Sequence, residues 1–160
     1  MAATDRTTIS ASLDELAAKL WANLVADPPT PAKPFRRVAV GRAGFQEHPR
    51  PFLALTVTRT RPIGAMDNDK LIQVTMTLRL VADILASDPH VALLAAIGAV
   101  EDYLDAIVET GVIGGADGFD DRTWVFDYPQ TAAGARVAAA EASQSFVVRV
   151  QREGNRVPPA

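Results

Sequence analysis

LIQVTMTLRLVADI, residues 71 to 84, alternates between apolar and polar side chains more cleanly than any other part of the chain. The apolar side consists of Ile72, Val74, Met76, Leu78, Leu80, Ala82 and Ile84. The polar side consists of Gln73, Thr75, Thr77, Arg79 and Asp83, interrupted only by Val81. A period of two predicts a β-strand with one buried and one wetted face. Residues 71 to 81 alone would span roughly 36 Å at about 3.3 Å per residue, against a radius of gyration of ~15 Å for a compact domain. Such a strand favours a shared or projecting sheet, and so an assembling structural protein over a self-contained enzyme.

The segment before this strand predicts a helix and then a stiff linker. Ser12 and Glu15 fit a capping box, so we expect the helix to begin at Ser12 and residues 1–11 to be a loose tail. Apolar residues follow at helical spacing: Leu13, Leu16, Ala17, Leu20, Trp21 and Leu24. We expect all of them to pack in the core. For Trp21 an interface anchor is the alternative, which its apolar neighbours on the stripe disfavour. The segment Asp27 to Pro31 contains three prolines, which end the helix.

Two further strands precede the long one. Phe35 to Arg42 reads as a weakly alternating first strand, and Phe52 to Arg61 as a second. In the second strand Leu53, Leu55 and Val57 line one face, and Thr56, Thr58 and Thr60 the other. The segment Pro62 to Asp69 carries turn residues and predicts an antiparallel hairpin with the long strand.

The second half of the chain predicts one helix and two strands. Asp88 and Pro89 open the helix, whose core stripe is Leu93, Ile97, Val100, Leu104 and Ile107, with Glu101, Asp102 and Asp105 mostly opposite. Glycines 111, 114, 115 and 118 then build a flexible acidic loop, and Arg122 to Tyr128 forms a short aromatic strand. The tract Thr131 to Gln144 is open to helix or strand. We favour a final strand from about Val137 to Arg152, followed by a frayed tail from Glu153.

These elements predict an α+β fold. It has one domain over residues 1–160, in which an antiparallel β-sheet with a long β-hairpin carries two α-helices packed on one face. The 48% hydrophobic content of the chain is enough for a core. Residues 1–11 and 153–160 are expected to be flexible tails.

Composition excludes several classes of function. The net charge of -3 argues against a nucleic-acid coating protein. Cysteine is absent, which excludes disulfides, thiolate catalysis and cysteine-based zinc sites. The N-terminal residues do not form a secretory signal, and no apolar stretch approaches the ~18 residues of a membrane span. We therefore expect a soluble protein of the cytoplasm with no membrane contact.

The search for catalytic chemistry finds no motif. His48 lies in a proline-rich loop and His90 in a first helical turn, and neither has metal-ligand spacing. Asp117, Asp120 and Asp121 have oxygen ligands for a hard cation, but a solvated surface loop accounts for them better. No phosphate-binding loop or nucleophile elbow occurs. We expect no catalytic residue, metal or cofactor.

Two groups of residues are candidates for contact with other subunits. The first lies on or beside the hairpin, where it forms either an ordinary wetted face or a surface that pairs with acidic residues of a neighbour. Its members are Arg59, Arg61, Arg79, Thr75 and Thr77. The second group consists of the aromatic residues Trp124, Phe126 and Tyr128, which share a face and are candidate interface anchors.

The order of these elements resembles a known family. The long strand (KLIQVTMTLRLVADI), the Asp-Pro-started helix (DPHVALLAAIGAVEDYLDAI), the acidic glycine loop and the closing strand (EASQSFVVRVQR) follow a capped helix, a proline break and a hairpin. This succession, over roughly residues 12 to 152, resembles the tail terminator proteins of long-tailed bacteriophages and related gene-transfer particles. It rests on the order and character of the elements, not on a diagnostic motif.

The resemblance implies a structural protein of the virion, assembled in the host cytoplasm and without enzymatic activity. It implies a homohexameric ring on the last ring of the tail tube, which stops tube polymerisation and presents its other face to the head-completion connector. DNA would pass through the lumen without specific binding, and Asp117, Asp120 and Asp121 are candidates for a lumen-facing acidic loop.

Three alternatives stay open. Another head-tail connector or tail-completion protein would have similar layering, and twelvefold symmetry would favour a connector. A small α+β enzyme or ligand-binding domain would need a concave pocket with converging polar groups. A generic soluble domain is the third.

Overall fold

The alternating stretch forms β3 (Asp69–Asp83), the central strand of a six-stranded sheet. The computed structural model describes residues 3–41, 48–83, 89–110, 116–117, 122–127 and 137–150. On one side of β3 lie β2 (Phe52–Met66) and then β1 (Arg37–Val40). On the other lies β6 (Val137–Val150), whose outer edge pairs with β4 (Ala116–Asp117) and β5 (Trp124–Asp127). All of these pairs are antiparallel except β1 with β2, so the sheet is mixed at one edge.

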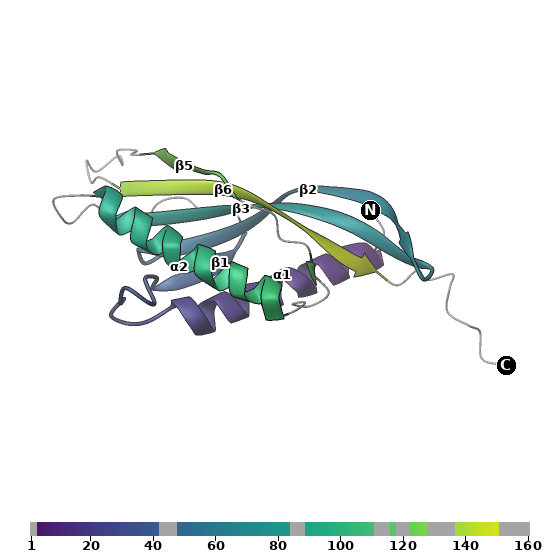
Figure 1. Ribbon diagram of the computed structural model, residues 1–160, viewed down its shortest axis with the longest axis horizontal. Coiled ribbons are helices and arrows are strands. Elements are labelled where there is room, and N and C mark those ends of the chain that lie inside the picture. The colour runs from purple at the N-terminus through teal and green to yellow at the C-terminus, as the bar shows by residue number, and fades with distance from the viewer. Residues whose placement is uncertain are drawn as a thin grey trace.

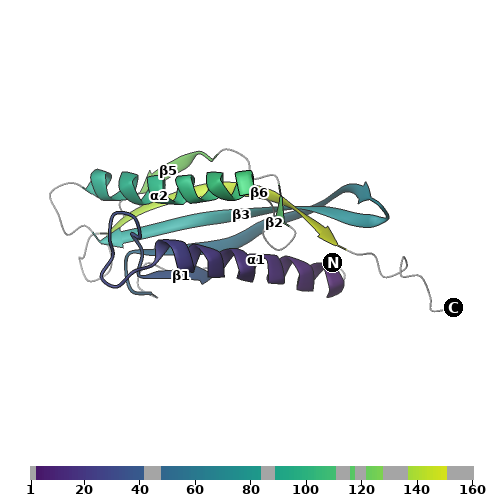
Figure 2. The same cartoon turned by 60° about the horizontal axis from the view of Figure 1, so that its bottom comes forward.

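Two helices cover one face of the sheet. Figures 1 and 2 show α1 (Ala3–Leu24) and α2 (Pro89–Thr110) side by side on that face. Their buried stripes join the apolar row of β3 in one hydrophobic cluster, in which Leu16, Leu20, Leu78, Leu93 and Leu104 are fully buried. The predicted α+β class, with two helices on one face, is therefore confirmed. None of the described helices is long and apolar enough to cross a membrane.

The predicted start of α1 is wrong. The helix begins at Ala3, so Ser12 is an interior residue, 1% exposed, and not a cap. Its hydroxyl donates to the Thr8 carbonyl oxygen at 2.9 Å, one turn earlier. Ile9 extends the buried stripe by a turn, and the buried Asp5 pairs with Lys70 Nζ at 2.7 Å. Packing against the sheet therefore keeps residues 3–11 helical despite their many threonines.

The predicted burial of Trp21 in α1 is also wrong. The side chains of Leu13, Leu16, Leu20 and Leu24 are buried as expected, whereas Trp21 is 44% exposed. The buried stripe is narrower than the apolar run in the sequence, because the sheet contacts only one side of the helix. After Leu24 the chain returns to the end of the helix at Phe35. Phe35 N donates to Leu24 O and Ala26 N donates to Phe35 O, each at 3.1 Å.

The β2–β3 hairpin is longer than the separate strands predicted. Each strand has 15 residues, about 50 Å at ~3.3 Å per residue. The segment Pro62 to Asp69 is mostly strand, and the turn consists of Asp67 and Asn68, with φ of 51° and 69°. Positive φ at both positions is typical of a two-residue type I′ turn, which Asn and Asp tolerate.

A bulge in β2 reverses part of the predicted facing. Thr56 pairs with Thr77 and Val57 with Met76, but Arg59 pairs with Thr75, so Thr58 is the extra residue. The bulge turns Thr60 towards the helices, opposite the buried Val74, and Arg59 away from them. The prediction that Thr56, Thr58 and Thr60 share a polar face is therefore wrong after Thr56.

The second half of the chain largely follows the predictions. In α2, Leu93, Ile97, Val100 and Leu104 are buried, and Asp102 and Asp105 are exposed. The tract left open between helix and strand is strand from Val137, and its alanines at 138, 139, 140 and 142 are buried. Several predicted features lie outside the described residues: Ile84, Asp88, Gly111, Gly114, Gly115, Gly118, Tyr128, 131–136 and 151–160. The side chain of Ile107 is also not described.

Candidate assembly surface

The sheet face that points away from the helices is largely polar, and we call it the outer face. The pairing register places side chains of β2, β3 and β6 on it in adjacent rows. The outer face consists of Thr56, Arg59, Arg61, Gln73, Thr75, Thr77, Arg79, Glu141, Ser143, Ser145, Val147 and Arg149. Most of these side chains are exposed or half-buried. A polar face of this length is available for contact with another molecule.

All five residues predicted for the hairpin surface lie on the outer face. Arg59 stands opposite Thr75, and Thr77 and Arg79 follow along β3. The bulge at Thr58 is what brings Arg59 and Arg61 onto this side. The hydroxyls of Thr75 and Ser145 are 3.0 Å apart, and Arg79 Nε lies 3.3 Å from Glu141 Oε1. The arrangement therefore offers hydroxyl groups at its centre and guanidinium groups nearer the hairpin tip.

One end of this face of the sheet is covered by the chain itself. Phe52, Ala54, Val81 and Ala139 form a second, small buried cluster there. The ring of His48 meets the ring of Phe52 edge-to-face at 5.2 Å between centroids. His48 is therefore a packing residue. His90 lies in the first turn of α2, as predicted, and its side chain is not described. Within the described ranges no three metal-binding side chains come together.

A buried guanidinium links β5, α2 and β6, and sequence reasoning missed it. The Arg122 side chain is 2% exposed and donates from Nε and Nη2 to the two carboxylate oxygens of Glu101, at 2.7 and 2.6 Å. Arg122 also bonds Gln144 and contacts Asp105 at 3.3 Å, while Trp124 Nε1 donates to Glu101 at 2.7 Å. A lone arginine before an aromatic strand was the available signal, but its partners are distant in sequence.

The electrostatics of this network hold both groups charged. The hydrogen bond from Arg122 lowers the pKa of Glu101, against the opposing effect of burial and with help from Trp124. Burial acts to lower the pKa of Arg122, but the bonds and charges of Glu101 and Asp105 outweigh it and raise that pKa. This is a structural ion pair that fixes β5 against α2. It explains why Glu101 is half-buried, where exposure was predicted.

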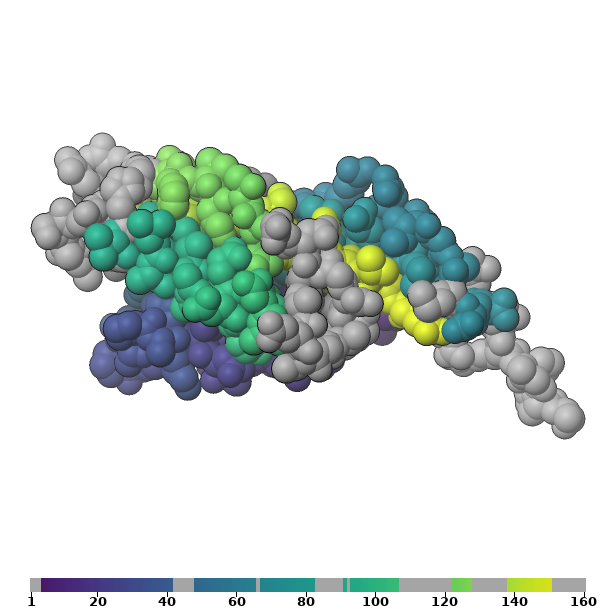
Figure 3. Space-filling view, in the orientation of Figure 1, coloured from purple at the N-terminus to yellow at the C-terminus, as the bar shows by residue number. Residues whose placement is uncertain are grey.

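Ion pairs also fix the end of the sheet where the hairpin turns. Arg149 Nε lies 2.5 Å from Asp69 Oδ2, and its Nη2 lies 3.4 Å from Asp67. The Lys70–Asp5 pair joins β3 to the first turn of α1. Beyond these contacts Arg61 to Ala65 are exposed, and Ile63 is 43% exposed. We call Arg61 to Asn68 the hairpin tip. In Figures 1 and 3 it projects past the N-terminal end of α1.

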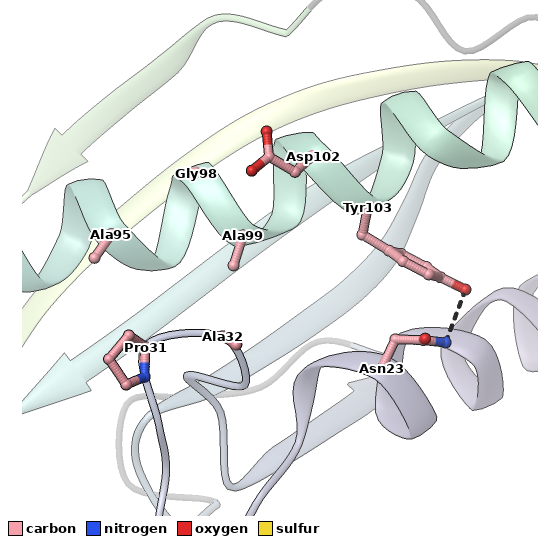
Figure 4. A pocket seen from close by; sticks show the side chains of 8 residues that line it. All are labelled: Asn23, Pro31, Ala32, Ala95, Gly98, Ala99, Asp102 and Tyr103. Carbon is pink, nitrogen blue, oxygen red and sulfur yellow. Dashed lines mark hydrogen bonds between the residues drawn. The ribbon is translucent and has the colours of Figure 1, made fainter.

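A groove lies between the two helices on their solvent side (Figure 4). Its cavity volume is about 520 Å³, and it is lined by Asn23, Pro31, Ala32, Ala95, Gly98, Ala99, Asp102 and Tyr103. Asn23 Nδ2 donates to the Tyr103 hydroxyl at 3.2 Å and closes one end. Burial raises the pKa of Tyr103, and this hydrogen bond opposes the rise. The proline segment predicted to be only a linker thus forms one wall of the groove.

The predicted acidic loop is only partly described. Asp117 lies in β4 and pairs with Val147 of β6, so this residue is in a strand and not in a flexible loop. Asp120 and Asp121 lie outside the described residues. Among the predicted aromatic anchors, Trp124 is half-buried and donates a hydrogen bond to Glu101, and Phe126 is 38% exposed. Phe126 and the exposed Val125 leave an apolar edge on β5.

No protein-family model and no curated protein sequence matches this chain.

Proposed function

We propose that this chain is a structural subunit of a phage virion that assembles into a ring at the end of the tail tube. The observation that carries the proposal is the β2–β3 hairpin, whose tip projects beyond the helical layer (Figures 2 and 3). The outer face of this hairpin is polar. A projecting arm contributes little to the core of its own subunit. Contact with a neighbouring subunit accounts for its length.

The outer edge of β2 supports assembly in a second way. β1 pairs only with Phe52 to Leu55, and no other described strand pairs with the outer edge of β2 from Thr56 to Met66. Backbone groups along such an edge are available to another chain. Arg59, Arg61 and Pro62 on this segment oppose indiscriminate strand pairing, because charges and proline at an edge disfavour it. Specific contact with one neighbour remains favourable.

A ring follows when one part of the subunit binds a different part of the next copy and the rotation closes. In the proposed role six copies sit on the last ring of the tail tube, stop its polymerisation and present their other face to the head-completion connector. The resemblance in the order of elements supports this role over that of other ring proteins of the virion. A ring of twelve copies would instead favour a connector.

Tube polymerisation tests the proposed role directly. The purified chain is added to growing tubes of its virus's tail-tube protein, and tube lengths are measured by negative-stain imaging. We expect shorter tubes, each with a cap of extra density at one end. Tubes of unchanged length without a cap would contradict the role. The matched control is a protein of similar size and charge that does not bind the tube.

The acidic residues give the proposed ring a testable property. We propose that Asp117, Asp120 and Asp121 face the lumen, where negative charge keeps passing DNA from binding. Replacing all three with asparagine should increase DNA retention by the isolated ring, most strongly at low salt. Retention equal to that of the unchanged ring would remove this assignment.

A further inference from the structure

We propose that the hairpin tip of one copy occupies the groove between α1 and α2 of the next copy. This inference rests on the proposed function, because it names the contact that would close the ring. It commits the groove to one occupant, which is a second copy of this chain.

The tip lies at one end of the molecule, and the groove lies towards the other. In Figures 1 and 2 the hairpin tip extends past the N-terminal end of α1, whereas the C-terminal end of α1 and the first half of α2 lie towards the other end. The groove is built from Asn23 near the end of α1, from Pro31 and Ala32, and from Ala95 to Tyr103 in the middle of α2 (Figure 4). A tip therefore does not reach the groove of its own subunit. Contact between them requires two copies and is head-to-tail.

The floor of the groove is made of small side chains that leave space. Ala95, Gly98 and Ala99 lie along α2 at the groove (Figure 4). A Cβ atom added at Gly98 would meet nothing within 4 Å, so packing within the chain does not require glycine there. Glycine inside a helix is about 1 kcal/mol less favourable than alanine. Space for a backbone or side chain from outside accounts for this glycine.

The two surfaces match in apolar character. Val91 and Leu94 of α2 are 63% and 57% exposed, and they lie on the same side of the helix as Ala95 and Gly98 by their spacing. The tip offers Pro62, Ile63 and Ala65, all exposed, and the large apolar side chain of Ile63 is 43% exposed. Insertion of this segment would bury apolar surface on both partners, which is the main source of association free energy.

The two surfaces also match in charge. Arg59 and Arg61 are exposed near the tip, and neither has an ion pair within the described part of the chain. Asp102 lines the groove and is exposed, whereas Asp105, one turn further along α2, already contacts Arg122 at 3.3 Å. The opposite charges of Arg61 on the tip and Asp102 in the groove favour one orientation of the tip.

A charge exchange tests the pairing of tip and groove. Arg61→Asp and Asp102→Arg should each weaken association of the full chain roughly fivefold to tenfold, because each replaces attraction with repulsion. The double variant should recover most of the lost association. Glu15→Arg and Arg37→Asp are matched controls, since both residues are exposed and lie outside the tip and the groove. Failure of the double variant to recover would overturn the pairing.

Cysteine cross-linking identifies the occupant. The chain has no cysteine, so Ile63→Cys in one copy and Ala95→Cys in another provide the only thiols. We expect the mixed variants to form a disulfide-linked dimer at least tenfold more than either variant alone, or than Ile63→Cys mixed with Glu15→Cys. Dimers from Ala95→Cys alone would place groove against groove and overturn the proposal. Absence of any dimer at concentrations where the chain associates would overturn it as well.

The outcome also separates this inference from the proposed function. A chain that forms rings and shortens tail tubes without the Ile63–Ala95 cross-link refutes the contact and leaves the ring role standing. A chain that forms the cross-link but neither forms rings nor shortens tubes retains the contact and refutes the role. A chain that stays monomeric without the cross-link refutes the contact.

Discussion

A buried guanidinium stabilises a fold only where its partners satisfy it, and Arg122 meets that condition. Glu101 accepts two hydrogen bonds from it, and Gln144 and Asp105 add further contacts. Trp124 Nε1 donates to Glu101 Oε1, the oxygen that also accepts from Arg122 Nε. Removal of the arginine would take its hydrogen bonds from the half-buried Glu101 carboxylate and from the buried Gln144 amide oxygen. The position of β5 therefore depends on one residue.

Arg122→Met should destabilise the protein by about 3 kcal/mol, at the low end for a broken buried pair because Glu101 is partly exposed. For a chain of this length that corresponds to a fall in Tm of about 6 to 12 °C. Thermal unfolding followed by circular dichroism measures it. The matched control is Arg36→Met, whose ion pair with Asp27 is exposed and should contribute less than about 1 kcal/mol. Equal losses in both variants would contradict the account.

Glu101 also makes a pH dependence predictable. Its pKa is lowered in the folded protein from 4.5, so its charged form stabilises the fold above about pH 4.5. This contribution is lost as the pH falls through the lowered pKa. Urea unfolding of the natural chain and of Glu101→Gln should therefore differ most near neutral pH, and the gap should narrow below about pH 4.5. A gap that stays constant down to pH 3 would show that Glu101 is not the titrating group.

Gly98 separates a folding role from an assembly role. Gly98→Ala and Gly98→Leu should both raise stability by up to about 1 kcal/mol, because each removes an interior helical glycine and neither Cβ meets a neighbour. Only the leucine side chain fills the groove. We therefore expect Gly98→Leu, and not Gly98→Ala, to lose self-association in sedimentation velocity. Unimpaired association of the leucine variant would contradict the assigned role of the groove.

At the scale of elements, the bulge in β2 decides which residues the hairpin presents. In the structure Thr58 is left out of the pairing, so Thr60 faces the helices and Arg61 the outer face. A strand that lacked Thr58 would continue from Val57 directly to Arg59 and keep these pairs. Every residue beyond the bulge would change face if the register moved by one.

Two deletions test this register. Deletion of Thr58 should cost only about 1 kcal/mol, because it removes the bulge and one hydrogen bond to the Thr75 carbonyl oxygen. Deletion of Thr60 should cost several times more, because it turns Arg61 towards the buried side opposite Val74. Chemical denaturation compares the two variants. A more stable Thr60 deletion would contradict the register.

The elements that the sequence predicts well are those with a buried face along the strand. β3 from Ile72 alternates except at Val81, and β6 from Ser145 alternates except at Val147, because the face of each strand towards the helices is buried. The start of α1 was missed because Ser12 is a plausible cap, and only the packing of Ile9 and the Asp5–Lys70 pair keep the preceding turns helical. The bulge was missed because threonine and arginine are both polar, so a shift by one leaves the pattern unchanged. The Arg122 network and the groove depend on contacts between distant segments.

At the scale of the whole molecule, the shape is that of a covered sheet with an arm. Both helices cover one face, the outer face is polar, and the hairpin tip lies at one end with the groove towards the other (Figures 1, 2 and 4). A subunit with complementary surfaces at its two ends extends into a chain of subunits unless a rotation between copies closes it. The proposed ring is the closed form of this contact.

The most direct test of self-assembly is the mass and shape of the purified full-length chain, measured by mass photometry and negative-stain imaging, alone and on tail-tube ends. The proposed role predicts a closed ring with a central hole and six times the 17.1 kDa mass of one chain. A particle of 17.1 kDa under both conditions, with tube ends left bare, would contradict it.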